Sequence, residues 1–463
     1  MRTPSRVTSV SVAPGSFCST ALIRLILPVG GLLATAAACL AGAVGGTNRV
    51  SITPAWLGQL NEEMRTNHPA MKSAGARLRA AAFNTNSVRS WEDPLFRFGG
   101  RIASPRGFKP SEEGDLVYAL EQKLPLFGKA QAARRVAQTE ADVQESRLAV
   151  QFQTLRRDLA KAVFAVALAE RVVEIGGLDL TWLETMSRIT GEHLRAGTAT
   201  QIEVLRVQNE HARRAEQLQS DRQRLEQARV AVNRLLGRPL ALSLPGLVLP
   251  PPAGPVPYSE RLSEYAIKSE PKLRMLGLEI QQAGAAVEVT RRSRRPEVSF
   301  GIEGRQFSGD GGFREGAFML GMSLPWINRS GYQSDLARDR ARLEAAQLDA
   351  ADYTQAVREE VHQLTVKIDA ARREARLSLS EILPRSEQAL ASAHANWQAG
   401  RGLFNDSMEA RRMVLEAQLM AARAVTEQYQ MMSDLVLCCG LGDLEALETL
   451  GLLDGATTEP RQP

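Results

Sequence analysis

Histidine and cysteine are the side chains of this sequence best suited to metal binding or to nucleophilic catalysis. No two of the histidines have the close spacing of metal ligands, and none is so spaced from a cysteine. No Ser-His-Asp or Cys-His set can be assembled either. The sequence therefore predicts no catalytic residue, no metal site, no cofactor and no enzymatic activity. The five histidines are His68, His193, His211, His362 and His394.

Two further motifs could suggest chemistry and do not support it. The glycine-rich segment 308–316 lacks the helix and the Lys-Ser/Thr pair that a phosphate-binding loop needs, so a hairpin loop is the better interpretation. Adjacent cysteines such as Cys438 and Cys439 form a disulfide only with strain. With Cys18 and Cys39 they form no recognisable disulfide framework.

The charge pattern argues against a nucleic-acid partner. The 463-residue chain has a formal net charge of +5, and no dense lysine-rich tract accompanies it. The densest basic cluster lies within 291–295, which holds four arginines. A solvated face or a contact with lipid headgroups explains that cluster as well as nucleic acid does.

The N-terminus predicts export. Residues 1–24 contain arginines and no acid, and an apolar stretch and then small residues follow, as in a secretory signal peptide. We expect residues 1–43 to be removed by cleavage after Ala43. Lipidation of Cys39 and an uncleaved anchor are the alternatives. No other apolar run reaches the length of about 18 residues that a transmembrane helix needs, so any crossing by the mature chain must use strands.

The remainder of the chain is a duplication. Leu124-Pro125 recurs as Leu324-Pro325, and the Ala-Gly pair ending at Gly197 recurs at Gly400. Similar spacings separate these landmarks, which predicts two copies of one structural unit. The expected divisions are a first repeat at 48–244, a proline-rich linker at 245–258, a second repeat at 259–440 and a tail at 441–463.

Each repeat has the pattern of a helix, two strands and a long helical hairpin. The first helix is expected from Thr53 to about Phe83 in one repeat and from Ser259 to about Arg292 in the other. The strands alternate apolar and polar residues, as in Val298, Phe300 and Ile302. These features predict a mainly α fold with a small membrane β portion.

The long helices follow a 3.5-residue apolar repeat. In the first repeat the helix runs from Lys129 to about His193 without a proline, with apolar residues stepping by four and three, which is typical of coiled-coil packing. Gly176-Gly177 and Pro384 are expected to bend or break the two long helices. Four strands cannot close a membrane barrel, where every backbone group must be paired, so several chains must share one.

This plan resembles the TolC-like outer-membrane efflux protein family over about residues 53–440. The segment Leu124–Lys129, followed by Ala132-Ala133-Arg134, is similar to the heavy-metal RND efflux branch. The resemblance implies a homotrimer with a 12-stranded barrel in contact with outer-membrane lipid and an α-helical periplasmic tunnel. It also implies a periplasmic adaptor, or membrane fusion protein, and an inner-membrane pump as partners, and export of small molecules or metal ions.

The resemblance also implies a gate at the periplasmic tip. The family's acidic residues, six and nine positions after the second hairpin glycine, correspond to Asp406 and Glu409. Gly197, Gly400 and Trp397 mark the hairpin tips where an adaptor would dock. The family's arginine two residues after that glycine is replaced by Gly402, which puts its latch in doubt. Without the resemblance, the two acids are explained as solvated residues at a helix start.

Two other functions remain open from the sequence. A periplasmic coiled-coil adaptor or scaffold would share the long helices, although it would need a further domain between them that is absent from this pattern. An outer-membrane conduit for type I protein secretion would share the whole plan.

Overall fold

The computed structural model describes residues 49–101, 115–307, 311–442 and 444. The predicted signal peptide, with Cys39 and Ala43, lies outside the described residues, as does nearly all of the predicted tail. Every element below belongs to one compact unit, Asn48–Pro463. No helix among the described residues combines the length and apolarity needed to cross a membrane.

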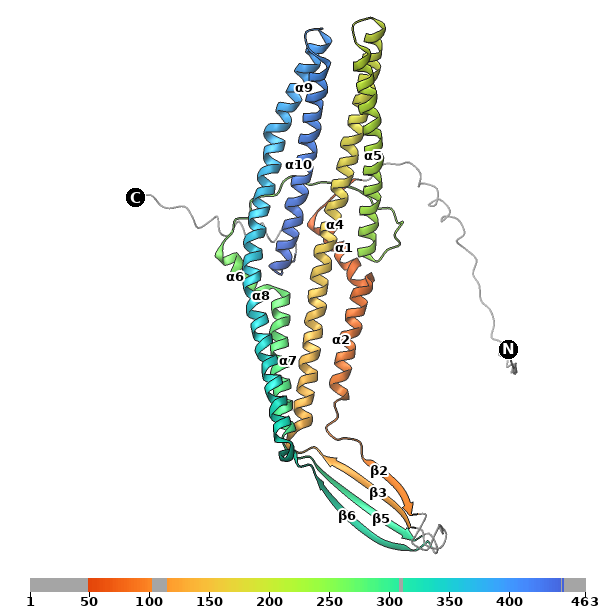
Figure 1. Cartoon of the computed structure of the whole chain (residues 1–463), viewed down its shortest axis with the longest axis vertical. Coiled ribbons are helices and arrows are strands. Elements are labelled where there is room, and N and C mark those ends of the chain that lie inside the picture. The colour runs from red at the N-terminus through yellow and green to blue at the C-terminus, as the bar shows by residue number, and fades with distance from the viewer. Residues whose placement is uncertain (1–48, 102–114, 308–310, 443, 445–463) are drawn as a thin grey trace, which may run out of the picture. The chain divides into compact units, whose positions relative to one another are not determined.

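The described elements follow the predicted order twice (Figure 1). The first series is α1 (Pro54–Asn67), α2 (Pro69–Ser87), β2 (Leu95–Arg101), β3 (Asp115–Leu124), the turn η1 (Leu126–Gly128), α4 (Lys129–Arg195) and α5 (Gln201–Leu236). The second is α6 (Glu260–Ser269), α7 (Pro271–Ser293), β5 (Val298–Phe307), β6 (Phe313–Met322), η2 (Pro325–Asn328), α8 (Arg329–Leu377), η3 (Ser378–Ile382), α9 (Leu383–Gln398) and α10 (Phe404–Cys438).

The prediction of one continuous first helix in each repeat was wrong. His68 separates α1 from α2, and Glu270 separates α6 from α7. Both residues precede a proline, and the proline ring excludes the helical conformation from the residue before it. His68 and Glu270 have ψ of 127° and 122°, and each side chain accepts a hydrogen bond from the backbone of the helix that follows.

The cap formed by His68 predicts that stability falls in mild acid. Its Nδ1 accepts a hydrogen bond from the Ala70 amide at 3.1 Å, which only an unprotonated nitrogen can do. Burial, and then the charge of Arg234, lower the pKa of His68 below its usual 6.5. The stabilisation is therefore fully present above pH 6.5 and is lost as the pH falls through the lowered pKa. We expect the free energy of unfolding to fall by up to about 1 kcal/mol when this cap is lost.

Thermal unfolding of the full chain between pH 7.5 and 5.5 checks this prediction. His68→Asn keeps a capping oxygen without a titration, so its midpoint should change less with pH than that of the wild type. Burial raises the pKa of Glu270, so that carboxyl responds with the opposite sign in both proteins. The difference between the two proteins isolates His68. Equal slopes would show that His68 does not titrate in this range.

The four longer strands form one antiparallel sheet in the order β2-β3-β5-β6. Each repeat contributes one hairpin, and β3 pairs with β5 to join them, with Leu120 opposite Ile302. Phe98 lies opposite Tyr118 in the first hairpin, and Ile302 lies opposite Phe318 in the second. The strands predicted from alternation are thus confirmed, and the two repeats share a sheet.

The predicted heptad positions are confirmed as core. Leu155, Leu159 and Val166 of α4 are buried with residues of α1, α5 and the strand β4 (Gly246–Val248). An equivalent core in the second repeat contains Val357, Val361 and Ile368 of α8, packed against α6 and α10. Each repeat therefore has its own helical core, built by the same periodicity.

The two predicted helix breaks had different outcomes. Gly176 and Gly177 lie inside the continuous helix α4, so no break occurs there. Gly176 is buried, and its missing side chain leaves room for Leu218 of α5. In the second repeat a single π-helical turn, η3, precedes Pro384. A proline inside a helix removes one hydrogen bond and crowds the carbonyl four residues before it, and a π turn relieves both effects.

The segment predicted as a linker, 245–258, is held against the helices. Its strand β4 (Gly246–Val248) pairs in parallel with β1 (Arg49–Ser51). Beyond it, the buried Gln428 of α10 donates to the Ala253 carbonyl and accepts from the Ala253 amide, both at 3.1 Å. The Gln428 side chain thus provides hydrogen-bond partners for backbone groups of the proline-rich segment that regular secondary structure does not pair.

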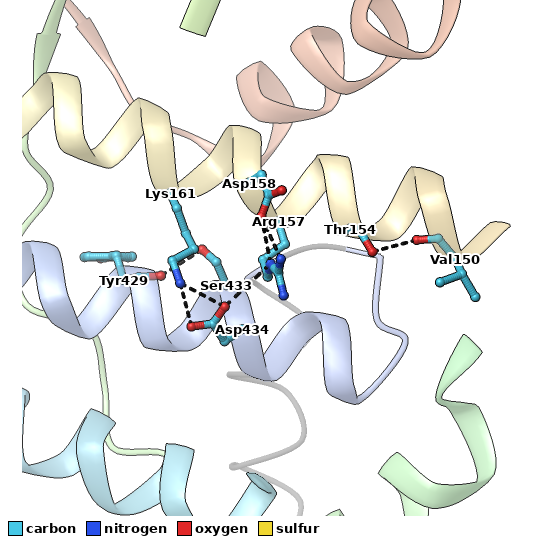
Figure 2. A network of polar contacts seen from close by, with 8 residues as sticks. All are labelled: Val150, Thr154, Arg157, Asp158, Lys161, Tyr429, Ser433 and Asp434. Atoms are coloured by element: carbon cyan, nitrogen blue, oxygen red, sulfur yellow. Dashed lines mark hydrogen bonds and ion pairs between the residues drawn. The ribbon is translucent and has the colours of Figure 1, made fainter. Parts of the chain in front are cut away.

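Helices α4 and α10 form a direct contact between the two repeats, with a polar network in it (Figure 2). Lys161 of α4 donates to both carboxylate oxygens of Asp434 of α10, at 3.1 and 2.9 Å. Arg157 lies one turn earlier and approaches the same carboxylate at 3.7 Å. Asp434 is largely buried, so these charged contacts fix the register between the helices.

Candidate functional site

The first hairpin tip connects α4 to α5. Gly197 has a φ of +75°, a conformation that closes a helix end and that other residues adopt at a cost. Its amide and that of Thr198 donate to carbonyls of the last turn of α4. Thr200 then begins α5 with a capping box, in which the Glu203 carboxylate accepts from the Thr200 amide at 2.9 Å.

The second tip connects α9 to α10 and differs at its helix start. Gly400 has a φ of +69°, as expected from its equivalence to Gly197. Leu403 begins α10 without a side-chain cap and is 69% exposed. A Cβ on Gly402 would lie 3.0 Å from the Asn396 Cβ, so a larger residue there would displace the turn.

Trp397 is buried where the two tips meet. Its ring stacks on His193 of α4 with centroids 5.2 Å apart and makes an edge contact with Phe404 of α10 at 5.3 Å. Met186 and Val207 complete this cluster. Only 8% of Trp397 is exposed, so it packs the tips together and its ring is not available on the surface of this chain.

Asp406 and Glu409 lie side by side on the exposed face of α10. They are three residues apart, while Phe404, Ser407 and Ala410 are buried on the opposite face. The Asp406 carboxylate has no ion pair among the described residues. Glu409 approaches Arg412 at 3.4 Å, but both side chains are more than half exposed, and such a pair contributes little. The two carboxylates therefore present negative charge to the surroundings of the tip.

The equivalent positions of the first repeat carry no such charge pair. Glu203, which corresponds to Asp406, is used in the capping box of α5. Arg206, which corresponds to Glu409, donates to the Asn405 side chain of α10. The duplicated tips have thus diverged, and only the second exposes two acids.

A buried charge cluster below the tips was missed by the sequence analysis. Asp179 of α4 accepts hydrogen bonds from Arg214 of α5 and Arg411 of α10, each at 2.8 Å. All three side chains are largely buried. The available signal was the spacing of Asp179, which lies four residues from both Ile175 and Leu183 and so shares a helix face with two buried apolar residues, where a charge requires a partner.

The sheet has one apolar and one charged face. Alternate residues such as Phe98, Phe318 and Leu320 are at least 70% exposed on one face. The other face carries ion pairs, including Arg97 with Glu121 and Arg305 with Glu315 at 3.0 Å. Exposed apolar residues in such number require a nonaqueous environment, whereas the paired charges suit water.

The described residues contain no group of three or more metal-ligating side chains close enough to hold an ion. His193 and His394 each contact the Trp397 ring, with ring centroids 5.2 and 5.8 Å away from that of Trp397. Cys438 and Cys439 are buried free thiols, and burial raises the pKa of Cys439 to about 12.

Comparison with known proteins agrees with this geometry. The model of a family described as outer membrane efflux protein matches residues 60–238 and 262–441. CzcC, a cobalt-zinc-cadmium resistance protein of Cupriavidus metallidurans, is 19% identical over 309 residues, which cover 66% of this chain and 72% of that protein.

Solved structures share the fold. The structure of CusC aligns with a TM-score of 0.74 at 15% identity, covering 84% of this chain and 93% of that chain. The outer membrane protein VceC from Vibrio cholerae aligns with a TM-score of 0.70 at 17% identity, covering 84% and 96% of the two chains.

The family match accounts for both halves of the chain. Its two segments cover most of the described residues and leave out the linker between them. The family is one of channels and not of enzymes. The chain therefore belongs to the outer membrane efflux protein family, and it is an efflux-channel subunit of the outer membrane with a periplasmic helical part.

Proposed function

We propose that Asp406 and Glu409 form a cation-selective constriction at the periplasmic tip of a homotrimeric channel. The observation that carries this proposal is the exposure of both carboxylates on one face of α10, with no base paired to Asp406 among the described residues. Threefold symmetry would bring six carboxylates together. Such a ring attracts cations and repels anions.

The sheet supports a shared barrel in the outer membrane. One chain contributes four long strands among its described residues, with apolar side chains on one face and ion pairs on the other. Lipid on the apolar side and water on the charged side satisfy both faces. Three chains would supply twelve strands and so pair the edges that β2 and β6 leave open.

The proposed cargo is a small cation, and metal ions are the first candidates. CzcC, a relative of this chain, is named as a cobalt-zinc-cadmium resistance protein. A carboxylate ring would raise the local concentration of such ions without holding them. The passage has no catalytic step in this proposal, and an inner-membrane pump supplies the energy.

A periplasmic adaptor would bind the hairpin tips. The turns at Gly197 and Gly400 end in exposed residues, and Leu403 offers an apolar side chain next to the second turn. Trp397 is buried between the two tips and holds them together. The adaptor thus contacts the turns, and their mutual position depends on the buried cluster.

Ion selectivity tests the constriction. Single-channel recordings of the purified oligomer in a planar bilayer give the permeability ratio of potassium over chloride from the reversal potential in a salt gradient. We expect the wild type to favour potassium, and the double variant Asp406→Asn, Glu409→Gln to reduce that ratio on the order of ten-fold, because the ring loses its charge while its size is preserved.

Glu216→Gln is the matched control, since it removes an exposed negative charge from α5 outside the tip. Its permeability ratio should equal that of the wild type. An unchanged ratio in the double variant would overturn the constriction but leave the channel intact. A folded oligomer that never conducts would instead favour the alternative of a periplasmic adaptor or scaffold. No observation favours type I protein secretion over efflux.

A further inference from the structure

A pocket lies where the sheet meets the helices. It is found beside the exit of β3 and the entry of β5, at the end of the sheet where Leu124 pairs with Val298. Its volume is about 220 Å³. Leu124, Pro125, Leu126 and Phe127 form an apolar wall along it. The pocket is therefore bounded on one side by the chain segment that leaves the membrane strand.

The charge around the pocket is positive. Five basic and two acidic side chains line it. The acids are engaged, because Glu92 pairs with Lys123 at 2.7 Å and Glu297 pairs with Lys129. Among the residues that the structure describes, the remaining guanidinium groups of Arg292 and Arg295 have no carboxylate partner. The fifth base, Arg89, pairs outside the pocket with Asp93.

A strained turn holds the two unpaired arginines in place. Phe127, with a φ of 61°, is the one non-glycine residue with a positive φ in the described part of the chain, and Gly128 follows with a φ of 68°. The Arg292 Nη1 donates to the Gly128 carbonyl at 2.7 Å. The guanidinium of Arg295 lies 5.8 Å from the centre of the Phe127 ring. Strain of this kind persists where the surrounding structure fixes it, often beside a ligand.

The pocket is at the level expected for a membrane interface. Trp91 and Trp326 are both more than half exposed close to this end of the strands, as is usual where lipid headgroups begin. The apolar face of the sheet begins beside them, with Phe96 and Met322 exposed. An occupant of the pocket would thus have its polar part beside the arginines and its apolar part beside the sheet.

We propose that this pocket binds the phosphate headgroup of an anionic phospholipid from the inner leaflet of the outer membrane. Arg292 and Arg295 contact the phosphate, and an acyl chain lies along Leu126 and Phe127. Two guanidinium groups without a counter-ion favour a lipid of net negative charge over a zwitterionic one. This inference rests on the proposed orientation of the sheet in the membrane.

Native mass spectrometry of the detergent-purified oligomer tests the site. The protein is titrated with phosphatidylglycerol or with phosphatidylcholine of the same acyl chains. We expect the wild type to retain phosphatidylglycerol preferentially. Arg295→Gln should weaken that binding about five-fold, the effect of one basic residue at an anionic surface, and leave phosphatidylcholine unchanged. Arg295 is exposed and its side chain has no hydrogen bond among the described residues, so this variant should fold.

Arg222→Gln on α5 is the matched control, because Arg222 is also exposed and does not line the pocket. Equal retention of both lipids, or equal losses in the two variants, would overturn the proposal. Displacement of the lipid by millimolar glycerol phosphate would identify a soluble phosphate site instead. Conductance is measured on the same samples. A channel that conducts but shows no lipid preference would refute the lipid site and leave the proposed channel function intact.

Discussion

Replacing Asp179 by alanine is expected to destabilise the helical part by about 3–5 kcal/mol. The change leaves the guanidinium groups of Arg214 and Arg411 buried without their shared carboxylate, and a buried charge that loses its partner costs far more than a surface ion pair contributes. The loss should be largest near the hairpin tips, because the three residues connect α4, α5 and α10 there.

Thermal unfolding in detergent measures this effect, at one protein concentration because the proposed homo-oligomer would contribute to stability. Asp179→Asn preserves volume and removes only the charge, so it should also lower the midpoint. Asp335→Ala is the control: Asp335 pairs with Arg338 at 3.0 Å on the surface and should change stability by less than about 1 kcal/mol. If the Asp179 and Asp335 variants unfold alike, the cluster does not stabilise the tips.

Gly440→Ala is expected to lower the free energy of unfolding by about 2–5 kcal/mol, because the backbone there is left-handed and the added Cβ would overlap a neighbouring atom. Gly440 has a φ of +59°, and an added Cβ would lie 2.4 Å from the Ser269 carbonyl oxygen. That oxygen belongs to the backbone just before the break at Glu270, so it cannot move aside cheaply. The end of α10 would be forced away from the junction of α6 and α7.

The duplication provides the matched variants. Gly237 ends α5 with a φ of +70°, and a Cβ there would lie 3.0 Å from the Asn67 carbonyl, so Gly237→Ala should also destabilise, though less. Gly197 has the same conformation with nothing within 4 Å, so Gly197→Ala should cost only about 1 kcal/mol. The order of the three unfolding midpoints checks the argument, and equal losses would show that backbone conformation alone sets the cost.

Features that depend on neighbouring residues were predictable from the sequence. Local sequence determines where the elements begin and end, through the two Leu-Pro segments and the glycines at 197 and 400. The apolar periods determine which face of each element is buried. The break at His68 followed from the same local rule, since a residue before proline avoids the helical conformation, but the periodicity on either side concealed it. The absence of a break at Gly176 could not be foreseen, because a long packed helix tolerates glycine where a partner fills the space.

Features that depend on partners distant in the sequence were decided by the tertiary structure. Periodicity identifies the buried face of α4 but not the helix that covers it, so it could not pair Asp179 with Arg411, 232 residues away. The pairing of β3 with β5, the strand formed by the linker and the burial of Trp397 between the tips have the same origin. A residue pattern specifies which side of an element avoids water, whereas the path of the whole chain determines what lies against that side.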